Sequence, residues 1–594
     1  MDTVTLTIDG RQITVEKGRT VLQAAIEHGI QIPFYCYHPA LGVDGSCRVC
    51  IVKVEKMPKL QTSCSTVCAD GMVVDTRAPE VIEARAGVFE FLLINHPLDC
   101  PVCDKGGECP LQDYSYSFGP DQSRMDFPRR VFDGEGVAGD VDFGPTLMLN
   151  RNRCILCTRC VRFMREIDGD AQIGIADRGN GSQIATFEER GVHSLISGNL
   201  MDVCPVGAIT TKDYRFASRP WDNPVAVDTV CTRCSKGCNI QVWLRAKPEW
   251  AKGPRLTRIT PRFNPAVNGY WVCDIGRFEH RWIETDDRLQ KPLVREGVRL
   301  AETTWSAALG RLGDLGSLAS AQLLVSGHSA VEELFVVREI ARLLGRDPKG
   351  FVSVGWSRSE KVQPARTKFR VPAIDAPNLR GARDLGLLDD DVPLEVPDHA
   401  RLRADVDAGR VRALIVLDPG PPGSLGNLGW IVDRRHQGVL EMLVVVGALR
   451  SPLADAADVV LPGATSLEKD ACYVNDQGRV QPASRVVAPP GEAREDWQVI
   501  VDLARACHLP LEFGSGHDVR TAIAAALGDI PDYAGLAEVE FGRPQVARHW
   551  LQASNPSERL KWHTLFRDAP PVKFADQGTS PAGEADSKPA RDTR

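Results

Sequence analysis

The opening of the chain alternates between apolar and polar residues in a way that predicts two strands followed by a helix. Apolar residues occupy every second position over residues 4–8 and again over 13–15, and the turn-forming pair Asp9-Gly10 lies between the two segments. Residues 21–28 then change to helical spacing. We therefore expect a β-hairpin and one helix at the start of the first domain.

A second region of regular patterning predicts an α/β domain in the C-terminal half. Residues 323–325, 413–417 and 442–446 are short, continuous apolar runs of strand length, and residues 331–344 have helical spacing. Continuous apolar runs are typical of parallel strands that are buried on both faces. We therefore expect a parallel sheet with flanking helices.

The pattern between and after these regions is less regular. Residues 79–95 have the spacing of an amphipathic helix that begins at a proline. Residues 110–145 are rich in Gly, Asp and Ser and have few periodic apolar positions, which predicts a connecting loop. The chain turns polar after Phe574, and residues 571–594 predict a disordered tail.

Composition and charge argue against several classes of protein. The 594 residues suffice for about four domains. The net charge of −7 leaves no basic surface for nucleic acid. The N-terminus has no export signal, and no run of 18 apolar residues occurs, so we expect a cytoplasmic protein that meets a membrane only peripherally, through partners.

Cysteine is concentrated in the first half of the chain, where it forms repeated short spacings. Of 18 cysteines, 16 lie before residue 274. In a reducing compartment such crowding favours metal thiolates over disulfides. The candidate ligands fall into four sets: Cys36, Cys47, Cys50 and Cys64; His96, Cys100, Cys103 and Cys109; Cys154, Cys157, Cys160 and Cys204; and Cys231, Cys234, Cys238 and Cys273. We name each set after its first residue.

The spacings favour iron–sulfur clusters over structural zinc. Zinc sites are usually assembled from two separate pairs of ligands, whereas the Cys154 set opens with CxxCxxC and the Cys231 set with CxxCxxxC. A neutral imidazole at His96 in place of a thiolate would raise the potential of its cluster. Cys68 is left over, and we interpret it as a passive buried thiol.

Several arginines surround the Cys154 set. They are Arg151, Arg153, Arg159, Arg162 and Arg165. Two interpretations are open: a solvated basic face, or cations that offset the negative charge of a cluster.

Taken in order, the four sets resemble those of the large iron–sulfur subunit family of respiratory complex I, the G-type subunits of bacterial NADH-quinone oxidoreductase. The phrases at residues 288–295, 457–462, 468–475 and 478–481 are similar to the molybdopterin oxidoreductase superfamily. The resemblance implies α+β iron–sulfur modules followed by an α/β domain. The implied domains are residues 1–78 (ubiquitin-like [2Fe–2S] ferredoxin type), 79–118 ([4Fe–4S] held by one histidine and three cysteines), 119–219 (bacterial ferredoxin-like [4Fe–4S]), 220–285 (fourth cluster, [4Fe–4S]) and 286–570 (molybdopterin-oxidoreductase-like).

The resemblance also implies a function. Electrons would come from a flavin subunit that oxidises NADH, pass the Cys36, Cys154 and His96 sets in that order, and leave to a ferredoxin-like subunit on the way to the quinone module. In the whole complex this transfer is coupled to proton translocation. The Cys231 cluster would lie off that route, and we expect no NADH or quinone site on this chain. The complex would place the chain on the cytoplasmic face of the inner membrane.

Other functions remain open. A molybdenum or tungsten enzyme such as an NAD-linked formate dehydrogenase shares the order of the N-terminal sets. Against it, Ile275 stands where a lysine commonly separates cluster from pterin, and the C-terminal region is short, so we expect no molybdopterin. A zinc-stabilised scaffold is the second alternative. The small subunit of an NAD-linked hydrogenase is a third, although it would normally end before the α/β half begins.

Overall fold

The computed structural model describes residues 2–132, 139–187, 190–245, 254–312, 321–394 and 399–546. These residues form two compact units, 2–95 with 113–129 and 96–112 with 130–546, and each unit is described by itself. The predicted disordered tail, 571–594, lies outside the described residues.

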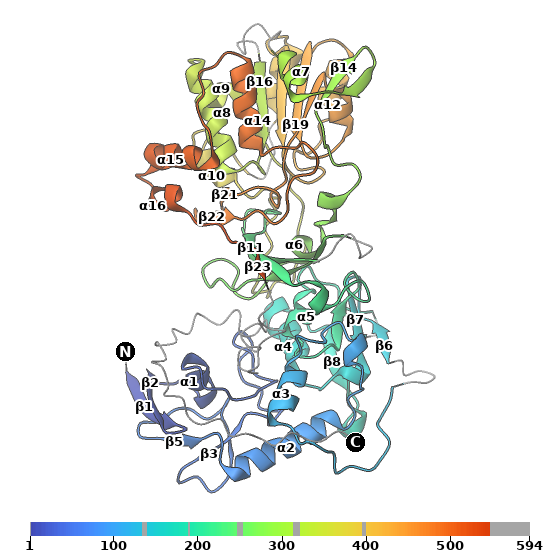
Figure 1. The fold of residues 1–594 in the computed structure, drawn as a ribbon, viewed down its shortest axis with the longest axis vertical. Coiled ribbons are helices and arrows are strands. Elements are labelled where there is room, and N and C mark those ends of the chain that lie inside the picture. Colours follow the sequence, from blue (N-terminus) through green and yellow to red (C-terminus); the bar gives the residue numbers. More distant parts are fainter. Residues whose placement is uncertain are drawn as a thin grey trace, which may run out of the picture. The chain divides into compact units, whose positions relative to one another are not determined.

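The first unit contains the predicted hairpin and helix (Figure 1). Its elements are β1 (Thr3–Ile8), β2 (Arg11–Glu16), α1 (Val21–Glu27), β3 (Ile51–Val54), β4 (Gln61–Thr62), β5 (Val73–Asp75) and α2 (Pro79–Leu93). The five strands pair in the order β2-β1-β5-β3-β4. Asp9 and Gly10 both have positive φ, at 51° and 79°, as a type I′ turn requires. Thr20 and Gln23 form a capping box that starts α1.

The segment predicted as a loop at residues 110–145 is partly regular, so that prediction is wrong. Pro110–Phe118 forms helix α3, and Asp140–Asp142 forms strand β6. Within the first unit, Tyr114 of α3 packs edge-on against Tyr35, with ring centroids 5.5 Å apart, and it is 1% exposed. Burial of these aromatic rings stabilises a helix that its polar sequence alone does not favour.

The second unit begins with small sheets that carry the cysteine sets. Its elements up to residue 278 are η1 (Cys100–Val102), β6, β7 (Leu147–Asn150), η2 (Arg151–Arg153), α4 (Arg159–Phe163), η3 (Met164–Asp168), β8 (Ile173–Ala176), η4 (Gly179–Gly181), β9 (Gln183–Thr186), α5 (Asn199–Val203), β10 (Ile209–Thr211), η6 (Pro220–Asp222), β11 (Val225–Val230), β12 (Asn239–Leu244), β13 (Leu256–Pro261) and α6 (Asp274–Phe278). The sheet orders are β10-β7-β6, β8-β9 and β13-β12-β11-β23, the last strand being Gln545–Val546.

The C-terminal part of the second unit is the predicted α/β domain. Its elements are η7 (Arg281–Glu284), β14 (Leu293–Glu296), β15 (Arg299–Glu302), α7 (Trp305–Gly310), β16 (Ala321–Ser326), α8 (Val331–Leu343), α9 (Pro348–Phe351), β17 (Val352–Gly355), α10 (Leu379–Asp384), α11 (Ala400–Asp407), β18 (Ala413–Asp418), α12 (Gly429–His436), β19 (Met442–Gly447), α13 (Pro452–Ala456), β20 (Val459–Pro462), β21 (Ala471–Val474), β22 (Val480–Ala483), α14 (Asp496–Ala506), α15 (Gly516–Leu527), α16 (Pro531–Ala534) and η10 (Leu536–Glu538).

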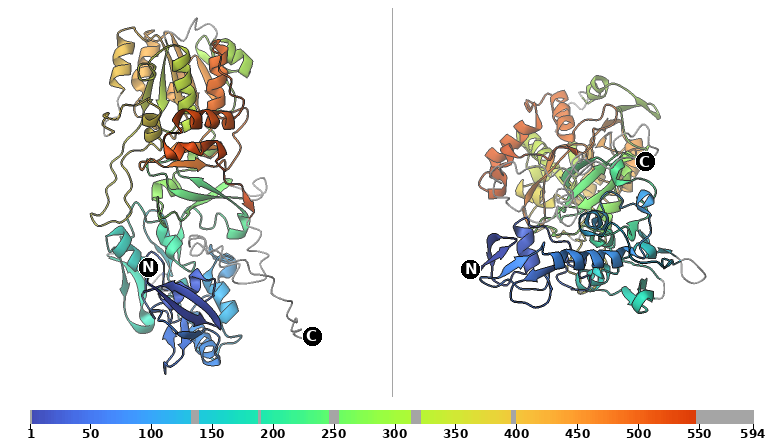
Figure 2. Two further views of the ribbon diagram at one scale, coloured as in Figure 1. Left: turned by 90° about the vertical axis from the view of Figure 1, so that its left-hand side faces the viewer. Right: turned by 60° about the horizontal axis from the view of Figure 1, so that its bottom comes forward.

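Seven strands of this domain form one sheet in the order β15-β14-β20-β19-β18-β16-β17. The five from β20 to β17 run parallel, as predicted. Alternate strand residues face opposite sides: Leu323 and Ile415 pack with α8 and α14, whereas Leu324 and Leu414 pack with α11 to α13. Helices therefore cover both faces of the sheet (Figures 1 and 2).

Candidate iron–sulfur sites

The four cysteines of the Cys36 set converge within the first unit. The Cys36 thiol is hydrogen-bonded to Cys47 and Cys64, and these bonds lower its pKa. A hydrogen bond with Cys64 lowers the pKa of Cys50 to about 7. Burial raises the pKa of the spare Cys68 to about 11, as expected for an unreactive thiol. The four sulfurs lie close enough to one another to share one small cluster.

The Cys154 set encloses a single cavity. All four of its cysteines line that cavity together with apolar side chains, among them Leu149 and Ile184. Leu156 and Thr158 have positive φ, at 52° and 63°, which turns the loop tightly between the cysteines. Burial, reinforced by the neighbouring thiols, raises the pKa of Cys154 to about 12. Buried thiols that repel one another's charge are typical of a site completed by metal.

The His96 set lies against the Cys154 set. Cys103 and Cys109 are buried, and Cys109 Sγ lies 3.9 Å from the carbonyl oxygen of Pro205, the residue after Cys204. A Cβ atom at Gly207 would lie 2.1 Å from Cys103 Sγ, so only glycine allows this approach. The ends of the two sets are therefore in direct contact.

The Cys231 set lies between β11, β12 and α6. The N–H of Cys231 donates to the carbonyl of Cys238 at 2.8 Å, and Cys273 Sγ accepts from the N–H of Gly276 at 3.4 Å. Burial raises the pKa of Cys273 to about 12. A Cβ atom at Gly276 would lie 2.9 Å from Cys231 Sγ, so this glycine keeps space beside the sulfurs.

The spacing of the donors bears on the choice between zinc and iron–sulfur clusters. Within the described ranges, no three His, Cys, Asp or Glu side chains converge closely enough to hold one metal ion. Zn–S bonds of about 2.3 Å would draw four sulfurs to about 4 Å from one another. A cluster of several atoms accepts more widely spaced donors, so these donor sets can accommodate iron–sulfur clusters.

Three of the arginines near the Cys154 set are not on a solvated face. Arg159 is 0% exposed, Arg162 4% and Arg153 7%. Arg159 donates to the carbonyl of Val203, and Arg153 pairs with Asp99 at 3.1 Å. Arg165, by contrast, has a side chain that is 61% exposed. Most of this basic cluster is therefore internal and close to the proposed ligands.

Sequence reasoning missed three charged residues inside the His96 loop. Asp104 pairs with Arg219, Lys105 Nζ donates to the carbonyl of Met201 at 3.5 Å, and Glu108 pairs with Arg258. The signal in the sequence that could have identified them was their position between the cysteines of one motif. Each residue fixes the loop to a different segment of the second unit.

The carboxyl edge of the α/β sheet does not fit a pterin. Lys469 is 1% exposed there and pairs with Glu333 and with Asp496, the latter at 2.7 Å. The cavity beside Cys231, lined by His328 and by residues 419–421, leaves a free volume of about 40 Å³. That volume suits a few water molecules rather than a pterin.

The fold and the cysteine sets define a class: an iron–sulfur electron-transfer protein joined to a molybdopterin-oxidoreductase-type domain. Family models match residues 1–79 (2Fe-2S iron-sulfur cluster binding domain), 85–124 (NADH-ubiquinone oxidoreductase-G iron-sulfur binding region), 144–210 (NADH-quinone oxidoreductase subunit 3, ferredoxin-like domain) and 427–506 (Molybdopterin oxidoreductase).

Whole-chain relatives carry the assignment further. The mitochondrial NADH-ubiquinone oxidoreductase 78 kDa subunit of Candida albicans is 33% identical over 87% of this chain and 84% of its own length. The NADH-quinone oxidoreductase G subunit from Rickettsia bellii is 30% identical over 90% of this chain and 91% of its own. The chain belongs to this family, the G or 78 kDa subunits of NADH-quinone oxidoreductase.

A solved structure of an NAD+-reducing [NiFe]-hydrogenase also matches, with 31% identity, 36% of this chain and 90% of that chain covered, and a TM-score of 0.32. Within the described residues, no helix is long and apolar enough to cross a membrane.

The ligand assignments and the domain boundaries stay predictions.

Proposed function

We propose that this chain relays electrons within NADH-quinone oxidoreductase, from an NADH-oxidising flavin subunit to a ferredoxin-like subunit on the way to quinone. The observation that carries the proposal is the direct contact between the His96 and Cys154 sets, at Cys109 and Pro205. Two electron carriers in series must lie close together, and this contact supports such a series. Those partners would hold the chain at the cytoplasmic face of the membrane.

The ligands divide among four clusters in this proposal. The Cys36 set would hold a [2Fe–2S] cluster, and the His96, Cys154 and Cys231 sets would each hold a [4Fe–4S] cluster. Bound clusters supply one-electron carriers that change oxidation state with little rearrangement. The chain buries most of these cysteines and lines the Cys154 cavity with apolar side chains, which limits the access of water.

Metal analysis of the anaerobically purified protein tests the ligand sets. We expect about 14 iron atoms per chain, little zinc, and neither molybdenum nor tungsten. About four zinc atoms with little iron would make the chain a zinc scaffold. Stoichiometric molybdenum or tungsten would instead favour the formate dehydrogenase type of enzyme.

A ligand substitution tests the relay in the assembled complex. His96→Ala should disturb one cluster and abolish quinone reduction, while an artificial acceptor at the flavin is still reduced. The matched control is Cys68→Ser, which should retain full iron content and turnover. Unchanged quinone reduction in His96→Ala, with its cluster absent, would disprove the proposed route.

A further inference from the structure

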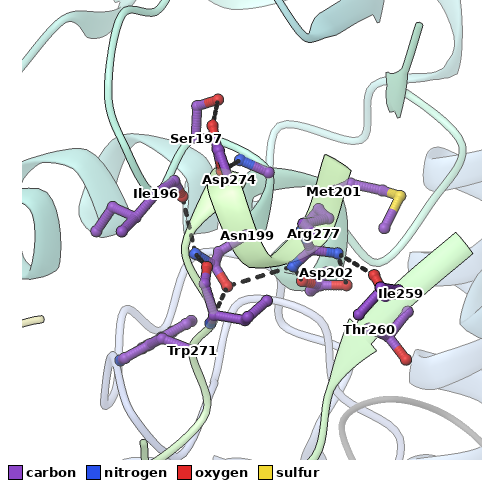
Figure 3. A network of polar contacts seen from close by, with 12 residues as sticks. Ile196, Ser197, Asn199, Met201, Asp202, Ile259, Thr260, Trp271, Asp274 and Arg277 are labelled. Atoms are coloured by element: carbon purple, nitrogen blue, oxygen red, sulfur yellow. Dashed lines mark hydrogen bonds and ion pairs between the residues drawn. The ribbon is translucent and has the colours of Figure 1, made fainter. Parts of the chain in front are cut away.

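Two buried arginines belong to the domain that carries the Cys231 set. Arg258 is on β13, and Arg277 is on α6, four residues after Cys273. Arg277 Nη1 donates to the carbonyl of Ile259, the residue after Arg258, at 3.1 Å. Figure 3 shows the Arg277 guanidinium between Ile259 and Asp202. The two arginines therefore share one platform.

Each arginine binds a carboxylate from outside its own domain. Arg258 pairs with Glu108 through two hydrogen bonds, of 2.7 and 2.6 Å, and its guanidinium lies 4.5 Å from the centre of the Trp243 ring. Arg277 pairs with Asp202, and the two side chains are 2% and 8% exposed. A planar guanidinium held by two bonds in a buried site fixes both the distance and the orientation of its partner.

Each carboxylate lies shortly before the last ligand of a different set. Glu108 directly precedes Cys109, the last ligand of the His96 set. Asp202 lies two residues before Cys204, the last ligand of the Cys154 set. Cys109 Sγ and the carbonyl of Pro205 are 3.9 Å apart, so these are the ends at which the two sets meet.

A separate group of bonds holds the arginine platform against the α5 region. Asn199 Nδ2 donates to the carbonyls of Ile196 and Val272, each at 2.8 Å, and Asp274 accepts from the N–H of Gly198 at 2.8 Å (Figure 3). Asn199 is fully buried, and Asp274 is half-buried. The segment before Cys204 is therefore tied to the segment around Cys273 by these bonds in addition to the ion pair, and Arg277 Nη2 also donates to Asn199 Oδ1 at 3.4 Å.

We propose that Arg258 and Arg277 are positioning residues for electron transfer: from one platform they clamp Glu108 and Asp202, and so fix the junction between the His96 and Cys154 sets. This inference rests on the proposed relay function. The domain that carries the Cys231 set would then help to position the clusters on the proposed electron route, although the Cys231 cluster is expected to lie off that route. Because each pair is neutral overall, the clamp acts through geometry rather than through net charge.

The proposal is tested on the assembled complex with Arg258→Met, Arg258→Lys and Glu108→Gln. Arg281→Met is the matched control, because Arg281 is 56% exposed and its carboxylate partner, Asp213, is 3.8 Å away. Iron content, the midpoint potentials of both clusters, their magnetic interaction in low-temperature electron paramagnetic resonance, and quinone reduction are measured together.

We expect Arg258→Met and Glu108→Gln to weaken the magnetic interaction and to slow quinone reduction at least about 10-fold, with iron retained. Arg258→Lys should recover only part of the rate of quinone reduction, because lysine keeps the positive charge but cannot donate two parallel hydrogen bonds to the carboxylate as a guanidinium does. If Arg258→Met loses iron, the result for Arg258→Lys decides whether Arg258 is a positioning residue.

Two results would overturn the proposal. One is opposite shifts of potential in Arg258→Met and Glu108→Gln with an unchanged magnetic interaction, which would indicate charge tuning. The other is wild-type behaviour in all three variants. Failure of the relay itself would appear differently, as low iron or absent quinone reduction in the wild-type protein.

Discussion

Lys469→Met should destabilise the α/β domain far more than the loss of an exposed lysine. The Lys469 ammonium lies between Glu333 and Asp496, and all three side chains are at most 1% exposed. Removing one partner from a buried ion pair leaves an uncompensated charge and costs about 3–5 kcal/mol. In a domain of this size that loss corresponds to a fall in melting temperature of about 10 °C.

The pH dependence of the loss identifies its cause. Burial raises the pKa of Glu333 to about 7, and Lys469 opposes that rise. Without Lys469 the pKa of Glu333 rises still further above its value in the unfolded chain. Stability is therefore lost as pH increases through the folded-state pKa of Glu333. The melting temperature of Lys469→Met should therefore fall more at pH 8 than at pH 6.

Thermal unfolding followed by circular dichroism measures both effects. The control is Lys291→Met, whose pair with Glu302 is 50% and 65% exposed and should contribute little to stability because solvent screens it. Equal losses in the two variants, or a loss in Lys469→Met that does not depend on pH, would refute the assignment of a charged buried pair.

Two further predictions concern single sites. Burial lowers the pKa of His328 to about 3, below its unfolded value, so this residue alone should remove about 2 kcal/mol of stability between pH 7 and pH 5. In thermal unfolding, His328→Gln should lack that contribution, so lowering the pH should destabilise it less than the wild type. Gly207→Ala should push a methyl group into Cys103 Sγ and remove up to about four iron atoms per chain, whereas Gly174→Ala, whose Cβ meets nothing within 4 Å, should keep them all; equal iron contents would contradict this packing.

Local patterns were sufficient to predict the elements that depend on near neighbours. The hairpin at Asp9-Gly10, the helix at Val331–Leu343 and the parallel strands follow from spacing and turn chemistry, and the structure confirms them. Helix α3 was missed because its stability comes from aromatic contacts with residues distant in sequence, such as Tyr35. A window of local sequence contains no information about those partners.

The candidate ligands were found for a different reason. Cysteines at short fixed spacings are rare, so the four sets were visible without knowledge of the fold. The charged residues that hold the sets together were not visible. Arg159 and Arg258 look like surface residues in the sequence, yet both are buried, because their partners are a backbone carbonyl and the carboxylate of Glu108. Whether a charged side chain is buried depends on its partner, and that partner is identified only by the tertiary structure.

The α/β domain acquires a role from the same reasoning. The hairpin β21–β22 packs on the loop of the Cys231 set: the N–H of Asp476 donates to the carbonyl of Ser235 at 2.8 Å, and Asn475 Nδ2 donates to the carbonyl of Lys236 at 3.3 Å. The arginine platform connects the same domain to Glu108 and Asp202 of the other two sets. A domain whose ligand edge is filled by the Lys469 ion cluster can thus serve as a rigid support. We infer that this support, transmitted through Arg258 and Arg277, is one contribution of the α/β domain to the proposed relay.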